Sequence, residues 1–423
     1  MSRAAADSNA LLHLHFEGYS DLEEVDCAML VGRNTAKPID PNTEIHGESA
    51  VADSKVRLLS DADADDGALE TLFPGLEVIP PILRGSGVWV GDTTVVKTLY
   101  SGVLDEMPKE FAIQQMLSLR GASASSGIVA LTSVEREVIE GSSALWTATM
   151  PKCPVTLDCI LPLLKLMMNA DDAAQNHLAF HILFAVYASL VRMLETFEGV
   201  GIVHFDLKLE NIGLTPDQDN GAQSAFDFGE AKYVGQQVLA PSGTVPYMAP
   251  EVPTCGISAS PAQDVYSMGC VLNALVCGDK PATPYTASSA AIVGYFIDQA
   301  REYNALHIAE MQKFSSSGLS GGECIRRASL ERRELFCATL AQFTDFKSCL
   351  LFVIAEMCAT LLDYRPVLAS LKLAEKQLQH LLPPLQSGYS VAGFFQRVAG
   401  ISPKHEMVSL KGEEERQHFP SQS

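Results

Sequence analysis

Residues 202–211 read Ile-Val-His-Phe-Asp-Leu-Lys-Leu-Glu-Asn, and this stretch decides what kind of domain the chain forms. It contains Asp206 and Asn211, and an Asp-Phe-Gly triplet at 227–229 begins sixteen residues after Asn211. Two carboxylates and an amide at this spacing suit phosphoryl transfer, which needs cations to offset triphosphate charge and a group to orient the attacking hydroxyl. Oxygen ligands from Asp and Asn also match magnesium, a hard cation.

The same segments carry a family resemblance. Residues 204–211 resemble the catalytic loop of eukaryotic protein kinases, and residues 227–229 match their magnesium motif. Residues 243–251, Gly-Thr-Val-Pro-Tyr-Met-Ala-Pro-Glu, resemble the end of the kinase activation segment. Residues 264–269 resemble the start of the buried helix that follows.

Two outer matches complete the series. Val95-Val96-Lys97 resembles the third strand of the kinase sheet, and Arg365 resembles the late arginine that pairs with the Glu of the Ala-Pro-Glu motif, here Glu251. Because the matches occur in the family's order from Lys97 to Arg365, the sequence is identified as a member of the eukaryotic protein kinase superfamily, serine/threonine type.

The resemblance implies a role for each matching polar residue. Asp206 would accept or orient the substrate hydroxyl proton, and Lys208 would lie near the transferred phosphate and offset its charge. Asn211 and Asp227 would hold Mg²⁺, and Lys97 would contact the α- and β-phosphates of ATP.

The helix partner of Lys97 is expected to be Glu110, with Glu106 as the alternative. The segment around Glu110 has helical spacing and an apolar face. With Glu110 chosen, Gln114 falls where kinases usually place an apolar residue, which is a departure from the family pattern.

The nucleotide site is less regular than in the family. A full glycine-rich loop is missing, and Gly85 and Gly87 form the cluster whose backbone would cover phosphates, with a plain turn as the alternative. Met150, Lys152 and Cys153 would be the gatekeeper and hinge, where adenine bonds backbone groups. Cys153 itself is expected to be a packing residue.

The resemblance also bears on the substrate. Ser/Thr kinases typically carry Lys at the place of Lys208 and Thr at the place of Thr244, so we expect protein substrates with Ser or Thr acceptors. The alternative is a pseudokinase, a nucleotide-binding scaffold or regulator. A small-molecule kinase of related fold is a third interpretation, but it would not need the Ala-Pro-Glu segment that ends at Glu251.

Control of the enzyme is expected to differ from most kinases. Phe205 stands where many kinases have an arginine that pairs with a phosphate on the activation segment, and Ala240 stands where that phosphate would be attached. These two differences predict an activation segment that needs no phosphate.

Strands precede helices along the chain. A hairpin is predicted for residues 88–99 with its turn at Gly91-Asp92, and further strands at 128–131 and 144–150. Helical spacing covers residues 108–119, 175–197, 262–276, 290–313, 332–362 and 368–382. The order predicts an α+β, bilobal protein-kinase-like fold with a small β-rich N-lobe and a larger helical C-lobe.

The organisation predicted from this pattern has four parts. An N-terminal extension with an acidic linker covers residues 1–72, the kinase N-lobe 73–150, the C-lobe 151–385 and a C-terminal tail 386–423.

The composition of the chain limits the binding partners and the cellular compartment that we expect for the protein. The net charge of −21 disfavours attraction to nucleic acid or anionic membrane. Ten scattered cysteines without a Cys-x-x-Cys pair disfavour zinc and disulfides and indicate an intracellular, cytoplasmic protein. The longest apolar-rich stretch, 178–194, is interrupted by His181 and Arg192, which predicts no transmembrane segment.

Residues 326–330, Arg-Arg-Ala-Ser-Leu, resemble a target of basophilic kinases, so Ser329 is a candidate site for an upstream kinase. The alternative interpretation is a helix start with two surface arginines.

Overall fold

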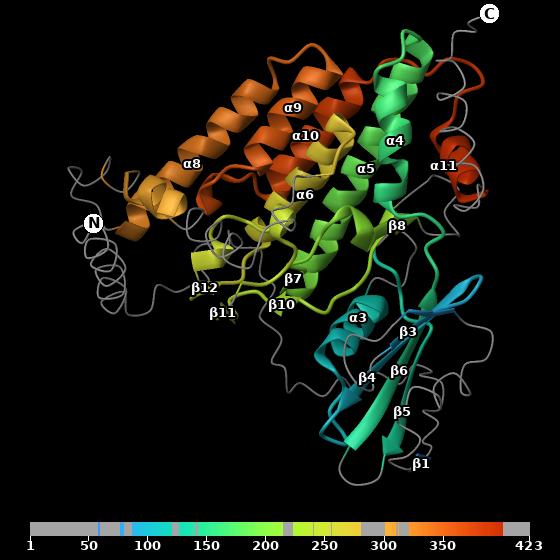
Figure 1. Ribbon diagram of the computed structural model, residues 1–423. Coiled ribbons are helices and arrows are strands. Elements are labelled where there is room, and N and C mark those ends of the chain that lie inside the picture. The colour runs from blue at the N-terminus through green and yellow to red at the C-terminus, as the bar shows by residue number, and fades with distance from the viewer. Residues whose placement is uncertain are drawn as a thin grey trace, which may run out of the picture.

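The computed structural model describes residues 58–59, 77–79, 87–120, 127–139, 143–214, 223–239, 241–254, 256–280, 301–309, 312 and 321–400 of the 423-residue chain. These residues form a β-sheet lobe with one helix and a larger helical lobe, joined after the last long strand of the sheet (Figure 1). The predicted α+β, bilobal fold is therefore confirmed. Most of the N-terminal extension lies outside the described residues, including the acidic linker.

The sheet has the strand order β1-β5-β6-β4-β3-β2, and only the β1–β5 pair is parallel. The predicted hairpin is confirmed, since Gly91 N donates to Thr94 O at 2.8 Å and Val88 lies opposite Lys97. The strand bounds are Leu58–Leu59 for β1, Glu77–Ile79 for β2, Gly87–Val90 for β3, Thr94–Ser101 for β4, Ser133–Ile139 for β5 and Ser143–Pro151 for β6.

One predicted strand was misplaced. The apolar run 128–131 contributes only an isolated bridge from Ile128 to Ala225, and the strand beside β6 is β5. Three of the residues in β5 are charged, Glu135, Arg136 and Glu137, so hydrophobicity did not reveal it. Residues 133–139 form a strand because their backbone pairs with β6, which their charged composition does not indicate.

Helix α3 (Lys109–Arg120) connects the two lobes. Phe111 packs against Ala144 and Trp146 of the sheet, whereas Ile113 and Leu117 belong to the core of the helical lobe. A helix buried on both sides is fixed in rotation, which sets the direction of Glu110.

Helix α5 (Ala173–Val200) is the centre of the helical lobe (Figure 1). Asp172 caps its first turn by accepting from Ala174 N at 2.9 Å, and Gly201 ends it with a φ of 73°. The helices around it are α4 (Leu157–Met168), α6 (Pro261–Cys277), α8 (Gly321–Leu340), α9 (Phe346–Met357), α10 (Leu368–Leu381) and α11 (Val391–Gly400).

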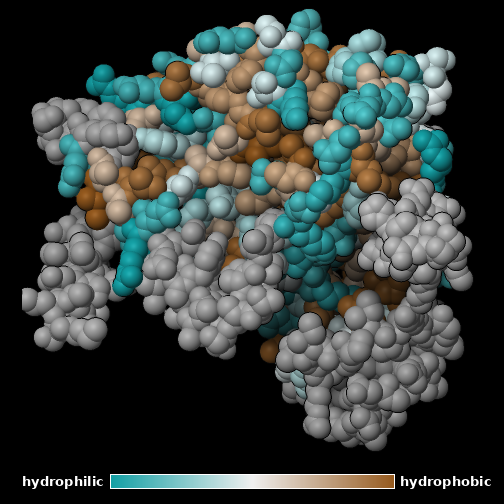
Figure 2. All heavy atoms as spheres, turned by 45° about the horizontal axis from the view of Figure 1, so that its top comes forward, coloured by the Kyte–Doolittle hydropathy of each residue, from teal (hydrophilic) through white to brown (hydrophobic). Residues whose placement is uncertain are grey.

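Among the described residues, α5 is the one helix long and apolar enough to pass for a membrane span. In its most apolar stretch 67% of the residues are buried against the rest of the lobe, as expected for the core helix of a folded domain. On the face that Figure 2 shows, hydrophobic and hydrophilic side chains alternate in small patches over the helical lobe.

The single helix predicted for residues 332–362 was wrong. Helix α8 ends at Leu340, and Asp345 starts α9 by accepting from Ser348 N at 2.9 Å. Of the helix predicted for 290–313, residues 301–309 and 312 are described, and they are helical.

The expected tail begins with a packed helix. Residues 386–423 had no assigned structure, yet α11 places Phe394, Phe395 and Val398 in the same core cluster as α5. The helical lobe therefore extends at least to Gly400, fifteen residues beyond the predicted boundary at 385.

Replacing a buried α11 ring tests this boundary. Phe395 is 3% exposed, so Phe395→Ala is expected to lower the free energy of unfolding by about 3 kcal/mol through lost burial and a cavity. Gln396→Ala, at an exposed neighbouring position, is the matched control and is expected to change it by less than about 0.5 kcal/mol. Urea denaturation of the full chain measures both, and equal stability of the two variants would exclude α11 from the cooperative core.

Candidate active site

The backbone of the catalytic loop is hydrogen-bonded to one buried carboxylate, that of Asp264. Asp264 of α6 accepts from His204 N at 2.7 Å and from Phe205 N at 2.9 Å. Burial raises the pKa of Asp264 to about 7, while the bonds from both N–H groups favour the carboxylate. Phe205 has a φ of 67°, a left-handed conformation that costs a non-glycine residue about 1–3 kcal/mol. The two hydrogen bonds hold the loop in this shape.

His204 links the catalytic loop to the Asp-Phe-Gly triplet. Its Nε2 lies 3.1 Å from Phe226 O, and its ring centroid lies 4.8 Å from that of Phe228. Phe228 also makes an edge contact with Phe197 of α5. Asp227, between these anchored neighbours, has a φ of 65°, so the packing around it sets the direction of its carboxylate.

Asp206 is surrounded by donors. Thr244 Oγ1 donates to Oδ1 at 2.6 Å, Lys208 Nζ to Oδ2 at 2.8 Å and Asn211 Nδ2 to Oδ2 at 3.0 Å. Lys208 Nζ also donates to Thr244 Oγ1 at 3.0 Å. The structure thus brings together the predicted catalytic pair and the predicted activation-segment threonine. Such a carboxylate is held in one orientation, as a group that positions a hydroxyl must be.

Lys97 connects the two lobes. Its Nζ lies 2.5 Å from Glu110 Oε1 on α3 and 3.0 Å from Asp227 Oδ1 in the helical lobe. Burial alone would lower the pKa of Lys97, but the charges of Glu110 and Asp227 raise it above its usual value, so the ammonium form is kept. Glu110, and not the alternative Glu106, is the partner of Lys97.

Asp227 keeps its negative charge. Burial pushes its pKa upward, but the charge and hydrogen bond of Lys97, followed by the charges of His204 and Lys208, leave that pKa below its usual value. Its side chain is 43% exposed, so part of it also remains accessible to solvent.

Asn211 and Asp227 fit a magnesium ion by the chemistry of their donors. The amide nitrogen of Asn211 is used in bonds to Asp206, which leaves its Oδ1 as the group for a cation. One carboxylate and one amide oxygen, completed by waters and phosphate oxygens, are the coordination that magnesium accepts. Their role as metal ligands stays a prediction.

The expected glycine cluster and hinge are only partly described. Gly85 lies outside the described residues. Gly87 begins β3, and an added Cβ there would lie 2.4 Å from the Trp89 ring, so packing alone requires glycine. Lys152 serves the hairpin, since its N donates to Thr93 O at 2.9 Å and its Nζ to Gly91 O at 3.1 Å. Contact of these residues with a nucleotide stays a prediction.

Cys153 is a packing residue in the structure. Its Sγ would lie 2.9 Å from a Cβ added to Gly213, so the two residues fit closely together. Burial raises the pKa of the Cys153 thiol to about 12, which keeps it protonated and unreactive.

The polar residue Gln114 has a local explanation that the sequence did not reveal. It is fully buried, and its Nε2 donates to Val129 O at 2.9 Å and lies 3.8 Å from Met150 Sδ. Gln114 therefore ties α3 to the backbone leading to β5, beside the predicted gatekeeper. An apolar side chain here would leave the buried Val129 carbonyl without this donor.

The activation segment ends at a buried ion pair. Arg365 donates from Nη1 and Nη2 to the two oxygens of Glu251, both at 2.7 Å, and both side chains are nearly inaccessible to solvent. The remaining guanidinium donors reach the carbonyls of Ala359, Ala262 and Thr360. The pair predicted from the resemblance is thus formed with every Arg365 nitrogen engaged.

The candidate phosphorylation motif lies within a helix. Arg326 pairs with Glu323 and Arg327 with Glu331 on the surface of α8, and Ser329 is half-buried. This is the alternative with two surface arginines, here in the helix interior. A kinase would need the helix to open at Ser329, so phosphorylation there stays a prediction.

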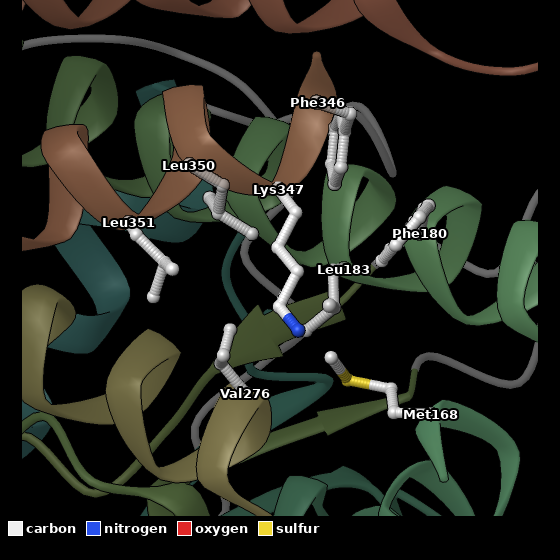
Figure 3. Close-up of a pocket in the computed structure, with 8 residues that line it drawn as sticks. All are labelled: Met168, Phe180, Leu183, Val276, Phe346, Lys347, Leu350 and Leu351. Carbon is white, nitrogen blue, oxygen red and sulfur yellow. The ribbon is translucent and has the colours of Figure 1, made fainter.

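A small hollow lies between α4, α5, α6 and α9 (Figure 3). Its lining is apolar except for Lys347. No lining residue belongs to the catalytic loop or the Asp-Phe-Gly triplet, and the side chains leave no room for a water molecule inside the hollow. The candidate site is therefore the group of side chains around Asp206, and not this hollow.

Two lobes bridged by Lys97, with a positioned carboxylate loop beneath them, are the architecture of bilobal protein kinases. The family model for the protein kinase domain matches residues 161–333. That range contains the catalytic loop, the Asp-Phe-Gly triplet and the Ala-Pro-Glu segment.

Curated relatives agree with this match. Calcium-dependent protein kinase 7 of Arabidopsis thaliana is 32% identical over 133 residues, 30% of this chain and 24% of that protein. The serine/threonine-protein kinase PknA of Mycobacterium tuberculosis is 40% identical over 94 residues, 21% of each chain. The matched region spans about a quarter or less of the length of these relatives. The match over residues 161–333 and these relatives support membership of the eukaryotic-type protein kinase superfamily.

The Arg365–Glu251 pair gives a stability prediction. Arg365→Met leaves the Glu251 carboxylate buried without its ion-pair partner, so the free energy of unfolding is expected to fall by about 3–5 kcal/mol. Arg326→Met, which removes an exposed pair, is the control and is expected to cost less than about 1 kcal/mol. Urea denaturation compares them, and a loss below about 1 kcal/mol for Arg365→Met would contradict the structural role of the pair.

Proposed function

We propose that this chain is an ATP-dependent protein kinase that transfers the γ-phosphate of magnesium-ATP to Ser or Thr of protein substrates. The observation that carries the proposal is the position of Lys97, whose ammonium group bonds Glu110 at 2.5 Å and Asp227 at 3.0 Å across the two lobes. In protein kinases this lysine–glutamate pair and the aspartate must both be in place for transfer.

The chemistry follows from the groups around Asp206. The substrate hydroxyl oxygen attacks the γ-phosphorus, the bond between that phosphorus and the β–γ bridging oxygen breaks, and ADP leaves. Asp206 orients the hydroxyl and takes its proton, while Lys208, 2.8 Å from Asp206, offsets charge on the transferred group. The bond from Thr244 keeps the Asp206 carboxylate turned toward the acceptor.

Asn211 and Asp227 would hold magnesium, and Lys97 would hold the α- and β-phosphates. When bound, magnesium neutralises charge on the β- and γ-phosphates and helps to align them. Without a cation the carboxylates of Asp206 and Asp227 would repel a triphosphate, so the two acidic groups favour a metal complex of the nucleotide over the free anion.

Thr244 supports a hydroxyl acceptor on serine or threonine. Its Oγ1 contacts both Asp206 and Lys208, the arrangement that the resemblance to Ser/Thr kinases implies. The names of the relatives point the same way, since PknA is a serine/threonine-protein kinase.

Removal of the proposed base tests the activity. Asp206→Asn is expected to reduce phosphate transfer to a Ser/Thr peptide library by at least about a hundredfold, because positioning and proton transfer are lost. ATP affinity, measured by calorimetry with magnesium, is expected to change only a few-fold. Wild-type protein that binds magnesium-ATP yet transfers no more phosphate than Asp206→Asn would overturn the enzyme in favour of a nucleotide-binding scaffold.

Two further substitutions separate nucleotide handling from folding. Lys97→Met is expected to abolish transfer, and Asp227→Asn to weaken nucleotide binding only when magnesium is present. Circular dichroism and the melting temperature are the controls, since both side chains are partly exposed to the cleft and neither change is expected to unfold the chain. Full transfer by Lys97→Met would exclude this location of the ATP site.

A further inference from the structure

Lys232, at the start of β10 (Lys232–Tyr233), is a lysine of the activation segment with three partner residues. Its Nζ donates to Ser242 Oγ at 2.9 Å and to the backbone carbonyl of Glu230 at 3.2 Å. It also lies 3.9 Å from Glu230 Oε2 and 5.1 Å from the centre of the Phe205 ring. Ser242 Oγ in turn donates to Glu230 Oε2. We call Glu230, Lys232 and Ser242 the Lys232 clamp.

Two of the three clamp residues are largely shielded from water, whereas the Glu230 side chain is 50% exposed. The Lys232 side chain is only 16% exposed, and Ser242 and Phe205 are buried. A lysine withdrawn from water needs compensating charge or dipoles. Here a carboxylate, a hydroxyl oxygen and the face of an aromatic ring supply them, and a cation over a ring contributes about 0.5–2 kcal/mol.

The clamp joins the two ends of the activation segment. Glu230 follows the Asp-Phe-Gly triplet directly, whereas Ser242 lies just before the segment end that approaches the catalytic loop. β10 is itself paired with β7 (Ile202–Val203), where Lys232 lies opposite Val203. The β10–β7 pairing therefore holds the early part of the segment against the catalytic loop. The bond from Lys232 to Ser242 connects the later part of the segment to the same place.

A short path leads from Ser242 to the proposed base. Gly243 has a φ of 98°, and an added Cβ there would lie 2.2 Å from Phe205 O, so the chain presses against the catalytic loop at this point. Thr244 comes next and donates to Asp206 at 2.6 Å. A shift of Ser242 would move Gly243 and Thr244, and with them the hydroxyl that orients Asp206.

The ring of Phe205 completes the arrangement. Phe205 packs in a cluster with Val203, Val238, Ala249 and Val252, which come from both arms of the activation segment and from β7. Phe205 therefore contacts both this apolar cluster and Lys232 of the clamp. Apolar packing of Phe205 and the polar contacts of Lys232 thus hold the segment without a phosphate.

We propose that Lys232, with Glu230 and Ser242, is a positioning residue that keeps the activation segment in its transfer-competent arrangement without a phosphate group. The inference rests on the proposed kinase function. Beyond that function, we infer that these three residues take the place of a phosphate group. They act on Asp206 through Gly243 and Thr244.

The first test compares Lys232→Met with Lys232→Arg. Lys232→Met is expected to lower kcat/KM for a Ser/Thr peptide by at least about tenfold, with KM for ATP unchanged, because the peptide side of the cleft loses order while the nucleotide side does not. Lys232→Arg keeps the charge and the donor and is expected to restore at least half of the activity. Lys372→Met, which removes an exposed pair with Glu195, is the control.

The second test measures order directly, so that it does not depend on catalysis. Hydrogen exchange of the Tyr247 amide, which donates to Thr244 O at 2.9 Å, is expected to accelerate at least about tenfold in Lys232→Met and in Ser242→Ala, but not in Lys372→Met. If the wild-type chain transferred no phosphate, the proposed function would fail and this measurement would still decide the clamp.

The third test concerns the aromatic ring. Phe205→Arg introduces the residue that many kinases have, but it places a second cation beside Lys232 and is expected to reduce activity at least about tenfold. Phe205→Leu keeps the apolar packing and is expected to retain more activity than Phe205→Arg. Phosphatase treatment of the wild-type protein is expected to leave transfer unchanged.

Three outcomes would overturn the inference. One is equal activity and equal exchange in Lys232→Met and wild type. Another is failure of Lys232→Arg to recover more activity than Lys232→Met. The third is loss of activity after phosphatase treatment that rephosphorylation within residues 227–251 restores.

Discussion

The two hydrogen bonds from the catalytic loop to Asp264 are the constraint on which the site depends. They fix His204 and Phe205, whose N–H groups donate them. The acceptor, Asp264, is a buried residue of α6 in the larger lobe. A strained φ at Phe205 persists only because its surroundings determine it so completely. From that fixed loop, His204 sets the backbone before Asp227, and the Phe205 carbonyl sets the approach of Gly243.

Charge balance explains why the groups around the cleft occur as sets. Lys97 forms ion pairs with Glu110 and Asp227. Lys208 pairs with Asp206, and Arg365 pairs with Glu251. Lys97 and Lys208 are each shared between a carboxylate and a further acceptor. The lobes are joined by the Lys97 bonds and by α3, whose Ile113 and Leu117 belong to the helical core. A change in the tilt of α3 would therefore reach both the ion pair and the core.

The sequence predicted the motif residues and the pairs between them, because those residues have fixed spacing within the family and distinctive chemistry. Lys97, Glu110 and Arg365 were placed with their partners in this way. What it did not predict depends on distant backbone. The Gln114 side chain bonds a carbonyl at Val129, and Lys232 faces a ring from another loop, contacts that no spacing rule encodes. Strand β5 was missed because its charged residues hide its pairing, and α11 because its apolar face becomes meaningful only against α5. The metal, nucleotide and hinge roles remain predictions.

The tight fit of Cys153 against Gly213 has a consequence for chemical probes. A thiol whose pKa is about 12 is almost entirely protonated at neutral pH, so electrophiles aimed at Cys153 would react slowly even when correctly placed. Any adduct would also have to displace the strand that carries Gly213 (β8, Ile212–Leu214). Cys159 and Cys277 are exposed, one in α4 and one at the end of α6. A reporter group attached at either position would therefore label the outer surface of the larger lobe and leave Cys153 unmodified.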